Sequence, residues 1–337
     1  MQEDRLQTAV FLIKYLSFSD RKDCADMAVK MTMEPYKNYG NCVKLENGVV
    51  ELYVTVDLGP RVIHYSTVGG ENLFCTDLDR VSFKKGPEMD AAFYPGAEGY
   101  IYGGHRLWVS PESFPYSYYP DNDPVAYEEI ENGVRLVNRP QIANNRQYTI
   151  ELTLDPDSSQ VTVRHAITNT GDTIQQFAPW SLNVMDKGGV EIIPVTQRET
   201  GLLPNRTLTL WDYSAMNDPR VRWGKKFITL RQDVNCTGNF KLGLSNEDGY
   251  ACLLNKGCVF ICRFDYLPGA DYPDGGCSME TFTNDFMTEI ESVGPMRSVN
   301  PGDTVCHTER WELKPVQKMP DLECEDSIEQ FIAAYVK

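Results

Sequence analysis

Residues 147–168, QYTIELTLDPDSSQVTVRHAIT, decide the fold class of this 337-residue chain. Two runs of alternating apolar and polar residues, 147–154 and 160–168, flank the residues 155–159, which are Asp, Pro and Ser. Alternation with a period of two is typical of a β-strand with one buried face, and Asp, Pro and Ser between two such runs favour a hairpin. The stretch therefore predicts two antiparallel strands that bury one face against a core.

Similar short runs of aromatic and β-branched residues recur along most of the chain, separated by Gly, Pro, Asn and Asp. Helical spacing of apolar residues occurs only near the ends, over residues 4–15 and 327–336. Because many strands without intervening helices favour sheet-on-sheet packing, we predict an all-β protein, a large antiparallel β-sandwich with short terminal helices. We expect an N-terminal extension packed on the sandwich (1–40), the sandwich domain (41–315) and a C-terminal helical tail (316–337).

Composition limits the partners of the chain. It has 32 basic and 48 acidic residues, a formal net charge of −16, which repels phosphate backbones and anionic lipid headgroups. We therefore expect no nucleic acid and no membrane as a partner. The apolar run 9–13 is too short to span a bilayer, and Glu3 and Asp4 precede it where a signal peptide would be basic. This pattern, with ten cysteines that lack CxxC spacing, predicts a cytoplasmic protein with reduced thiols.

Several functional side chains lie close together in residues 103–112, GGHRLWVSPE. If the segment is extended, Arg106 and Trp108 share one face, and His105 directly precedes Arg106, just after two glycines. An indole that stacks on a sugar, beside a guanidinium that donates to two hydroxyls, is typical of carbohydrate sites. In the alternative interpretation, Trp108 fills the core and Arg106 forms a structural ion pair.

The other three histidines have simpler interpretations. His165 alternates with apolar residues on one face of its predicted strand, and His64 lies in a similar strand, so both are predicted to be core residues. His307 shares a strand face with Glu309, which fits either a paired site or a half-exposed sheet surface.

Glu280 follows the glycines at 275–276 and shares a predicted strand face with Ser278, Phe282 and Asn284. A carboxylate buried beside aromatic rings is costly unless it is hydrogen-bonded, and burial raises its pKa toward the range useful for a general base. A glutamate on an exposed sheet surface fits the same pattern.

The strongest enzyme signatures are missing from the sequence. It contains no GxSxG, GxxxxGK[ST] or HExxH motif and no dinucleotide fingerprint. Asp271, Asp274 and Asp285 do not have the spacing of a calcium loop. We therefore predict neither a cofactor nor a metal site.

Taken in order, several segments resemble the galactose mutarotase-like superfamily, the relatives of aldose 1-epimerase. The resemblance covers residues 47–313 and implies a β-supersandwich with an open cleft across a sheet that binds a sugar. It rests on the segments 46–48, 59–63, 70–74, 105–108, 168–172, 279–281, 289–295 and 300–302 followed by 309–311.

The resemblance also implies catalytic roles. In the family a glutamate acts as general base and a histidine as general acid while the sugar ring opens and recloses. Glu280 matches the position of that glutamate. Arg106 is similar to the arginine that holds substrate hydroxyls or a phosphate, and Arg61 is a second candidate for that task.

The family's histidine has no counterpart in this chain. It would fall within residues 177–186, FAPWSLNVMD, where Trp180 or Asn183 occupies its neighbourhood. The acid must then be His105, a tyrosine or Asp186, or the acid is missing.

Three functions fit these residues. The first is a sugar 1-epimerase that acts on an aldose with Glu280 as base and His105 as acid. The second is a non-catalytic carbohydrate-binding or sensing protein. The third, a lyase or hydrolase of oligosaccharides, needs a second carboxylate facing Glu280 across the sugar, for which Glu112 is the candidate. The expected partner is a small sugar or sugar phosphate. Separately, we expect the N-terminal segment either to pack on the sandwich or to mediate a homodimer. The expected substrate-binding residues are Arg61, Arg106, Trp108, Glu112, Trp180 and Asn183.

Overall fold

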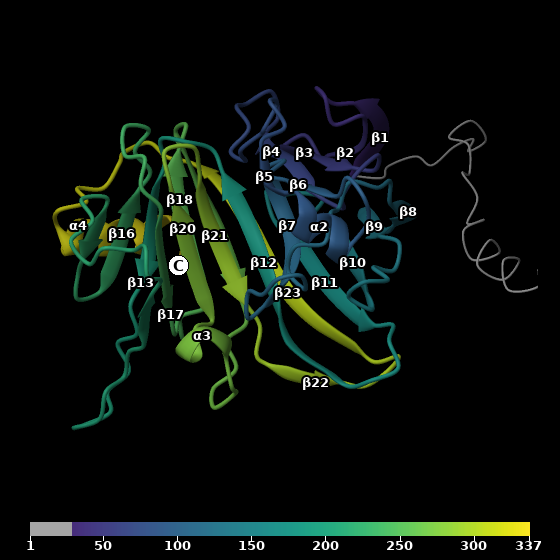
Figure 1. Ribbon diagram of the computed structural model, residues 1–337. Coiled ribbons are helices and arrows are strands. Elements are labelled where there is room, and N and C mark those ends of the chain that lie inside the picture. The colour runs from purple at the N-terminus through teal and green to yellow at the C-terminus, as the bar shows by residue number, and fades with distance from the viewer. Residues whose placement is uncertain (1–28) are drawn as a thin grey trace, which may run out of the picture.

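Two large sheets, packed face to face, form most of the computed structural model, which describes residues 29–337 (Figure 1). The strand pairs in both sheets are antiparallel. The predicted all-β sandwich is confirmed. The helix predicted over residues 4–15 lies outside the described residues.

The first sheet has eleven strands. Its edge strand β1 lies within the segment 1–40 and pairs with the neighbouring strand β2. In spatial order the strands are β1 (Lys30–Pro35), β2 (Asn41–Glu46), β3 (Val50–Thr55), β4 (Val62–Thr67), β7 (Gly104–Ser110), β12 (Gln175–Met185), β21 (Thr288–Val293), β20 (Met279–Thr283), β17 (Phe240–Leu244) and β14 (Leu208–Leu210), with β22 (Arg297–Val299) off this path.

The second sheet has ten strands, and the smaller elements surround the two sheets. Its spatial order is β15 (Val221–Trp223), β16 (Phe227–Arg231), β13 (Val190–Pro194), β18 (Tyr250–Asn255), β19 (Cys258–Phe264), β23 (Thr304–Pro315), β11 (Val161–Asn169), β10 (Arg146–Leu154), β9 (Gly133–Val137) and β8 (Ala126–Ile130). The remaining elements are the pair β5 (Ser82–Lys85) and β6 (Glu98–Tyr100) and the helices α2 (Pro87–Ala92), α3 (Pro273–Gly276) and α4 (Glu325–Tyr335).

The predicted hairpin is the β10–β11 pair. Leu152 lies opposite Val163 and Leu154 opposite Val161, and buried and partly exposed residues alternate along β10. The buried side chains contribute to one continuous core between the two sheets. Alternation in the sequence therefore identified both the pairing and the buried face.

Helix α4 covers the far side of the second sheet. Ile328, Phe331 and Ile332 pack against Ile192 and Ile261, so the helix buries the apolar stripe that its sequence spacing predicts. Within residues 29–337, no helix combines the length and apolar character needed to cross a membrane.

Candidate functional site

The two faces of the first sheet carry different chemistry. Along β7, His105 and Leu107 point toward the second sheet, because His105 contacts Trp311 of β23 and Leu107 joins the inter-sheet core. Arg106 and Trp108 point the opposite way, as alternation requires. We call the side facing the second sheet the inner face and the opposite side the outer face.

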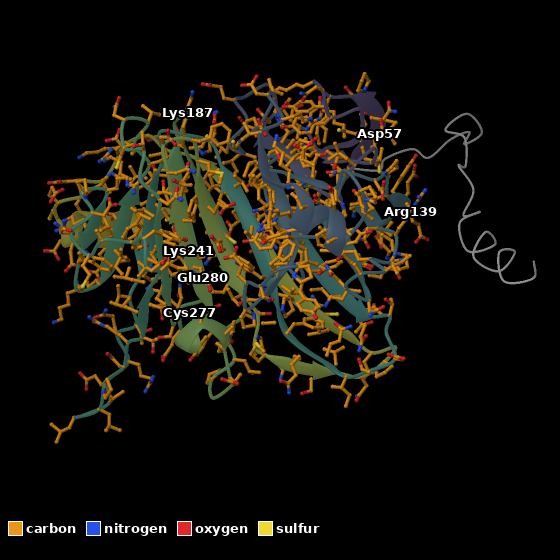
Figure 2. All side chains as sticks on the ribbon, in the orientation of Figure 1. Asp57, Arg139, Lys187, Lys241, Cys277 and Glu280 are labelled. Carbon is orange, nitrogen blue, oxygen red and sulfur yellow. The ribbon has the colours of Figure 1, made fainter. Side chains whose placement is uncertain are left out.

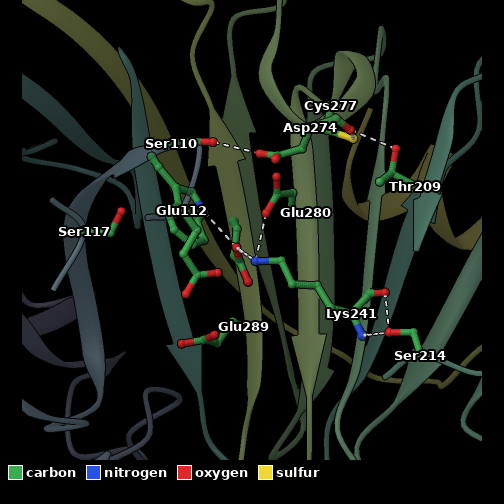
Figure 3. A network of polar contacts seen from close by, with 12 residues as sticks. Ser110, Glu112, Ser117, Thr209, Ser214, Lys241, Asp274, Cys277, Glu280 and Glu289 are labelled. Atoms are coloured by element: carbon green, nitrogen blue, oxygen red, sulfur yellow. Dashed lines mark hydrogen bonds and ion pairs between the residues drawn. The ribbon is translucent and has the colours of Figure 1, made fainter. Parts of the chain in front are cut away.

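A buried lysine lies at the centre of the outer face. The Nζ atom of Lys241 on β17 is 2.8 Å from Glu280 Oε2 on β20 and 2.9 Å from Glu291 Oε2 on β21 (Figure 3). The β20–β21 register places Glu280 directly opposite Glu291, so both carboxylates reach the same ammonium. Figure 2 shows Lys241 and Glu280 side by side on the sheet. All three side chains are buried.

The single ammonium of Lys241 cannot balance two ionised carboxylates, so ionisation of both Glu280 and Glu291 would leave an excess negative charge in the protein interior. Burial raises the pKa of Glu280, and the neighbouring Glu291 raises it further, while Lys241 opposes both effects. Although burial lowers the pKa of Lys241, the two carboxylates raise it above its usual range. The lysine is therefore held charged, and Glu280 keeps its proton to a higher pH than an ordinary glutamate does.

Two carboxylate oxygens next to Lys241 have no hydrogen-bond partner among the described residues. The Oε1 atoms of Glu280 and Glu291 are buried and, within residues 29–337, accept no hydrogen bond. Buried polar atoms are normally hydrogen-bonded, so these two oxygens are acceptors that a bound hydroxyl group would satisfy.

Arg106 and Glu289 form a second charged pair on the same face. Arg106 Nη2 lies 3.4 Å from Glu289 Oε1, and its guanidinium carbon is 3.9 Å from the ring centre of Trp108. The Nε and Nη1 groups of Arg106 are buried and lack a partner among the described residues. Burial raises the pKa of Glu289 to about 7 against the opposing effect of Arg106, and Glu291 adds to the rise.

Aromatic rings pack against the two charged groups. Trp108 and Trp180 meet edge to face with ring centres 5.6 Å apart, and the Nε1–H of Trp180 donates to Glu291 Oε2 over 2.7 Å. The ammonium of Lys241 lies 4.5 Å from the ring centre of Trp180 and 4.8 Å from that of Trp211. We define the outer-face cluster as Arg106, Trp108, Trp180, Lys241, Glu280, Glu289 and Glu291.

The glycine-containing turn before Glu280 is tied to the neighbouring strands. In α3, Asp274 and Gly275 adopt positive φ angles of 55° and 81°. The hydroxyl of Ser110 donates to the Asp274 carboxylate over 2.8 Å, and that of Thr209 donates to the Asp274 carbonyl over 2.9 Å (Figure 3). These bonds fix the start of β20 and so the position of Glu280.

The structure brings together four of the predicted site residues and places a fifth, Glu112, at their border. Arg106, Trp108, Trp180 and Glu280 share the outer-face cluster. Glu112, on the loop after β7, is exposed and accepts a hydrogen bond from the hydroxyl of Tyr118, whose ring packs on Trp108. It borders the cluster, since it also contributes to raising the pKa of Glu289.

His105 and Asn183 lie on the inner face, which corrects the expectation that they share a site with Glu280. His105 is fully buried and its Nδ1 lies 2.9 Å from Asn183 Oδ1. Burial lowers the pKa of His105 to about 3, with a smaller opposing effect from Asn183. The backbone of the first sheet lies between these side chains and the outer face, so neither side chain can touch a sugar bound on that face.

Arg61 is not part of the cluster. It is 1% exposed, forms a 2.6 Å ion pair with Asp121 and lies over the ring of Tyr102. Asp121 lines a small pocket beside β7 together with Arg106 and other residues, but Arg61 does not. Arg61 therefore forms a structural ion pair, and it is near enough to Arg106 to add to the effect of burial in lowering the pKa of Arg106.

Sequence reasoning missed Lys241, Glu289 and Glu291. The only signal for the glutamates is that they flank Ile290 in β21, where carboxylates alternate with apolar residues. Lys241 occupies one position in the short apolar run FKLGL and carries no signal of its own. All three are identified by the register of neighbouring strands.

The fold has relatives among solved structures, whereas no protein-family model and no curated protein sequence matches the chain. A Klebsiella pneumoniae protein, provisionally named an aldose 1-epimerase, superposes with a TM-score of 0.57 at 12% identity over 91% of this chain and 87% of that chain. A galactose mutarotase-like protein from Clostridium acetobutylicum gives 0.52 at 10% identity over 86% and 99%. A TPR-domain containing protein from Parabacteroides distasonis gives 0.54 at 15% identity over 84% of this chain, which spans only 50% of that chain.

These similarities establish the architecture. The chain has a galactose mutarotase-like fold, as the resemblance in its sequence implied. Fold alone does not assign a reaction, because one architecture supports many functions.

Proposed function

We propose that the outer-face cluster binds an aldose and interconverts its two anomers by acid–base catalysis. The observation that supports this most directly is Glu280, a buried carboxyl with a raised pKa and one unpartnered oxygen, facing a cluster with two tryptophans. A general acid or base is most effective when its pKa lies near the working pH, and indole rings suit the apolar faces of sugars.

In this mechanism the ionised form of Glu280, held beside the Lys241 ammonium, takes the proton of the anomeric hydroxyl. The bond between C1 and the ring oxygen breaks as the C1 carbonyl forms, and the ring oxygen receives a proton from Glu289. After rotation about C1–C2 the same steps run in reverse and return both protons. No proton or electron is consumed overall.

Glu289 replaces His105 as the proposed acid. It lies two residues from Glu291 on the same face of β21, diagonally across from Glu280, and diagonal neighbours of this kind are about 7–8 Å apart at the backbone. Its pKa of about 7 keeps a fraction of it protonated at neutral pH.

One observation favours a second function, sugar binding without turnover. Within residues 29–337, the outer-face cluster contains no histidine, whereas the sequence resemblance implies a histidine acid. A cluster without an effective acid would bind the sugar and leave its anomers in slow exchange, because general acid–base help contributes about 10²–10⁴-fold to the rate.

Exchange NMR of anomers distinguishes the two functions. Wild type, Glu280→Gln and Glu151→Gln are each added to a panel of free and phosphorylated aldoses. Glu151 is a matched control, since it is a strand carboxylate paired with Arg135 on the second sheet. We expect wild type and Glu151→Gln to accelerate exchange for one sugar, and Glu280→Gln to lose at least about 100-fold in rate while still binding.

Two results would change this assignment. Line broadening of a sugar by wild type without faster exchange would identify a binding protein. Unchanged turnover by Glu280→Gln would remove Glu280 from the mechanism.

A further inference from the structure

A second group of polar side chains lies between the two sheets, on the inner face. His105 of β7, Asn183 of β12, His165 of β11 and Glu309 of β23 are all fully buried. The Nε2 atoms of His105 and His165 are 2.8 Å apart. Ligand atoms of His105, His165 and Glu309 lie within 4.8 Å of one another.

The hydrogen bonds of Asn183 determine the protonation of His105. The Nδ2 group of Asn183 donates to Glu309 Oε2 over 3.0 Å, which turns its Oδ1 toward the histidine. Because an amide oxygen only accepts, His105 must donate from Nδ1. In a neutral ring the Nε2 atom then carries a lone pair.

His165 is constrained in the same way from the other side. Its Nδ1 lies 3.2 Å from the backbone carbonyl of His307, which also only accepts. His165 must therefore donate from Nδ1 and carry its lone pair on Nε2. Two lone pairs thus face each other over 2.8 Å, an arrangement that is repulsive unless a cation lies between them.

The surroundings also contain a buried negative charge. Glu309 accepts hydrogen bonds from Ser292 over 2.6 Å and from Trp311 over 2.8 Å, in addition to Asn183. Three hydrogen-bond donors on its two oxygens favour the ionised carboxylate over the protonated acid. Among the described residues, no lysine or arginine forms an ion pair with it.

We propose that His105, His165 and Glu309 bind a divalent first-row metal ion through the two Nε2 atoms and the carboxylate. Two imidazoles and one carboxylate form a donor set that suits zinc and its neighbours. Each ligating ring already donates its other nitrogen to an oxygen, which is the usual support of a metal-bound histidine. The sequence pattern predicted no metal site, since the three ligands come from three separate strands and form no spaced motif.

All three ligands must move to accept the ion. Zinc–nitrogen bonds of about 2.0–2.1 Å in tetrahedral geometry place two nitrogens about 3.3 Å apart, so the rings separate by about half an ångström. Glu309 Oε1 accepts only from Ser292 and so has a lone pair that no described residue uses. The Glu309 ligand oxygen, which is within 4.8 Å of the ring nitrogens, must approach to about 3.3 Å from them. Because the ligands are buried, we expect the ion to enter during folding.

Zinc serves as the probe. The full chain is unfolded in denaturant with a chelator, refolded with or without zinc chloride and freed of loose metal, and its zinc is measured by mass spectrometry. We expect one zinc per chain in wild type and in His64→Gln, and none in His165→Gln. His64 is a matched control, as it is a buried histidine bonded instead to Tyr36 and Ser66.

A second measurement uses wild type alone, in case His165→Gln does not fold. In ¹⁵N NMR of labelled histidines, zinc should shift the Nε2 signals of His105 and His165 and leave those of His64 unchanged. The proposal is overturned if wild type retains no zinc and the two Nε2 atoms share a proton instead. Zinc retained by a folded His165→Gln overturns it as well, because the ion would then be bound elsewhere.

Discussion

The ammonium of Lys241 lies 2.8 Å from the carboxylate of Glu280, and both side chains are buried on the outer face of the first sheet. The same ammonium is 2.9 Å from Glu291, so one cation holds two carboxylates in place. Lys241 therefore organises the outer-face cluster, although no sequence pattern identified this lysine as a functional residue.

Lys241→Met should be strongly destabilising. Removal of the ammonium leaves two buried carboxylates without their cation, and breaking a buried ion pair from one side costs about 3–5 kcal/mol. Urea unfolding at pH 7 measures the change. Lys226→Met is the control, because Lys226 pairs with Glu329 at the surface and its loss should leave the midpoint near that of wild type. Equal midpoints for the two variants would contradict the central role of Lys241.

Glu289 should make stability fall as the pH rises. Its pKa is about 7 in the folded chain against an ordinary value of 4.5, so the folded state holds a proton that the unfolded state has released. The stability that this bound proton contributes to the folded state is complete below pH 4.5 and is lost as the pH rises through 7.

The comparison of wild type with Glu289→Gln isolates this effect. Between pH 4.5 and 7, the unfolding free energy of wild type should fall relative to the variant, by up to about 1.4 kcal/mol per pH unit for one proton. Urea unfolding at a series of pH values checks it. Parallel curves for the two proteins would mean that Glu289 titrates normally.

Arg106→Lys should weaken sugar binding. The substitution keeps the charge beside Glu289 but removes the planar fork whose Nε and Nη1 groups lack partners. Charged hydrogen bonds contribute about 1.5–3 kcal/mol, so we expect a loss of affinity of about 10-fold or more. Calorimetric titration with the sugar identified by NMR measures it, with the surface variant Arg135→Lys as control. Wild-type affinity in Arg106→Lys would place the sugar elsewhere.

Arg61→Met should affect stability and not sugar affinity. Arg61 is buried against Asp121 and Tyr102, and Asp121 loses its charged partner in the variant. Because Asp121 retains some contact with solvent, we expect a cost of about 1–3 kcal/mol in unfolding free energy. Unfolding and calorimetric titration of the same preparation test both statements. A loss of sugar affinity at unchanged stability would return Arg61 to the binding site.

Much of the fold was predictable from local patterns. The alternation in residues 147–168 identified the β10–β11 hairpin and its buried face, and apolar spacing near the C-terminus identified α4. The short helices α2 and α3 were not predicted, since each spans too few residues to show a helical period.

The candidate site was predictable only in part. Arg106 and Trp108 could be paired because they lie two residues apart on one strand, where alternation alone places them on the same face. The partnership of Glu280 with Lys241 and Glu291 could not, because it depends on which strands are neighbours and in what register.

The sequence by itself determined the fold class, the paired faces of single strands and the presence of functional side chains in β7 and β20. Only the tertiary structure decided which of those side chains meet. It placed His105 on the face opposite to Glu280 and beside His165, although the two histidines are far apart in the chain. The physical reason is that strand alternation is a local property, whereas contacts across a sheet or between sheets depend on strand order and register, which non-local packing sets.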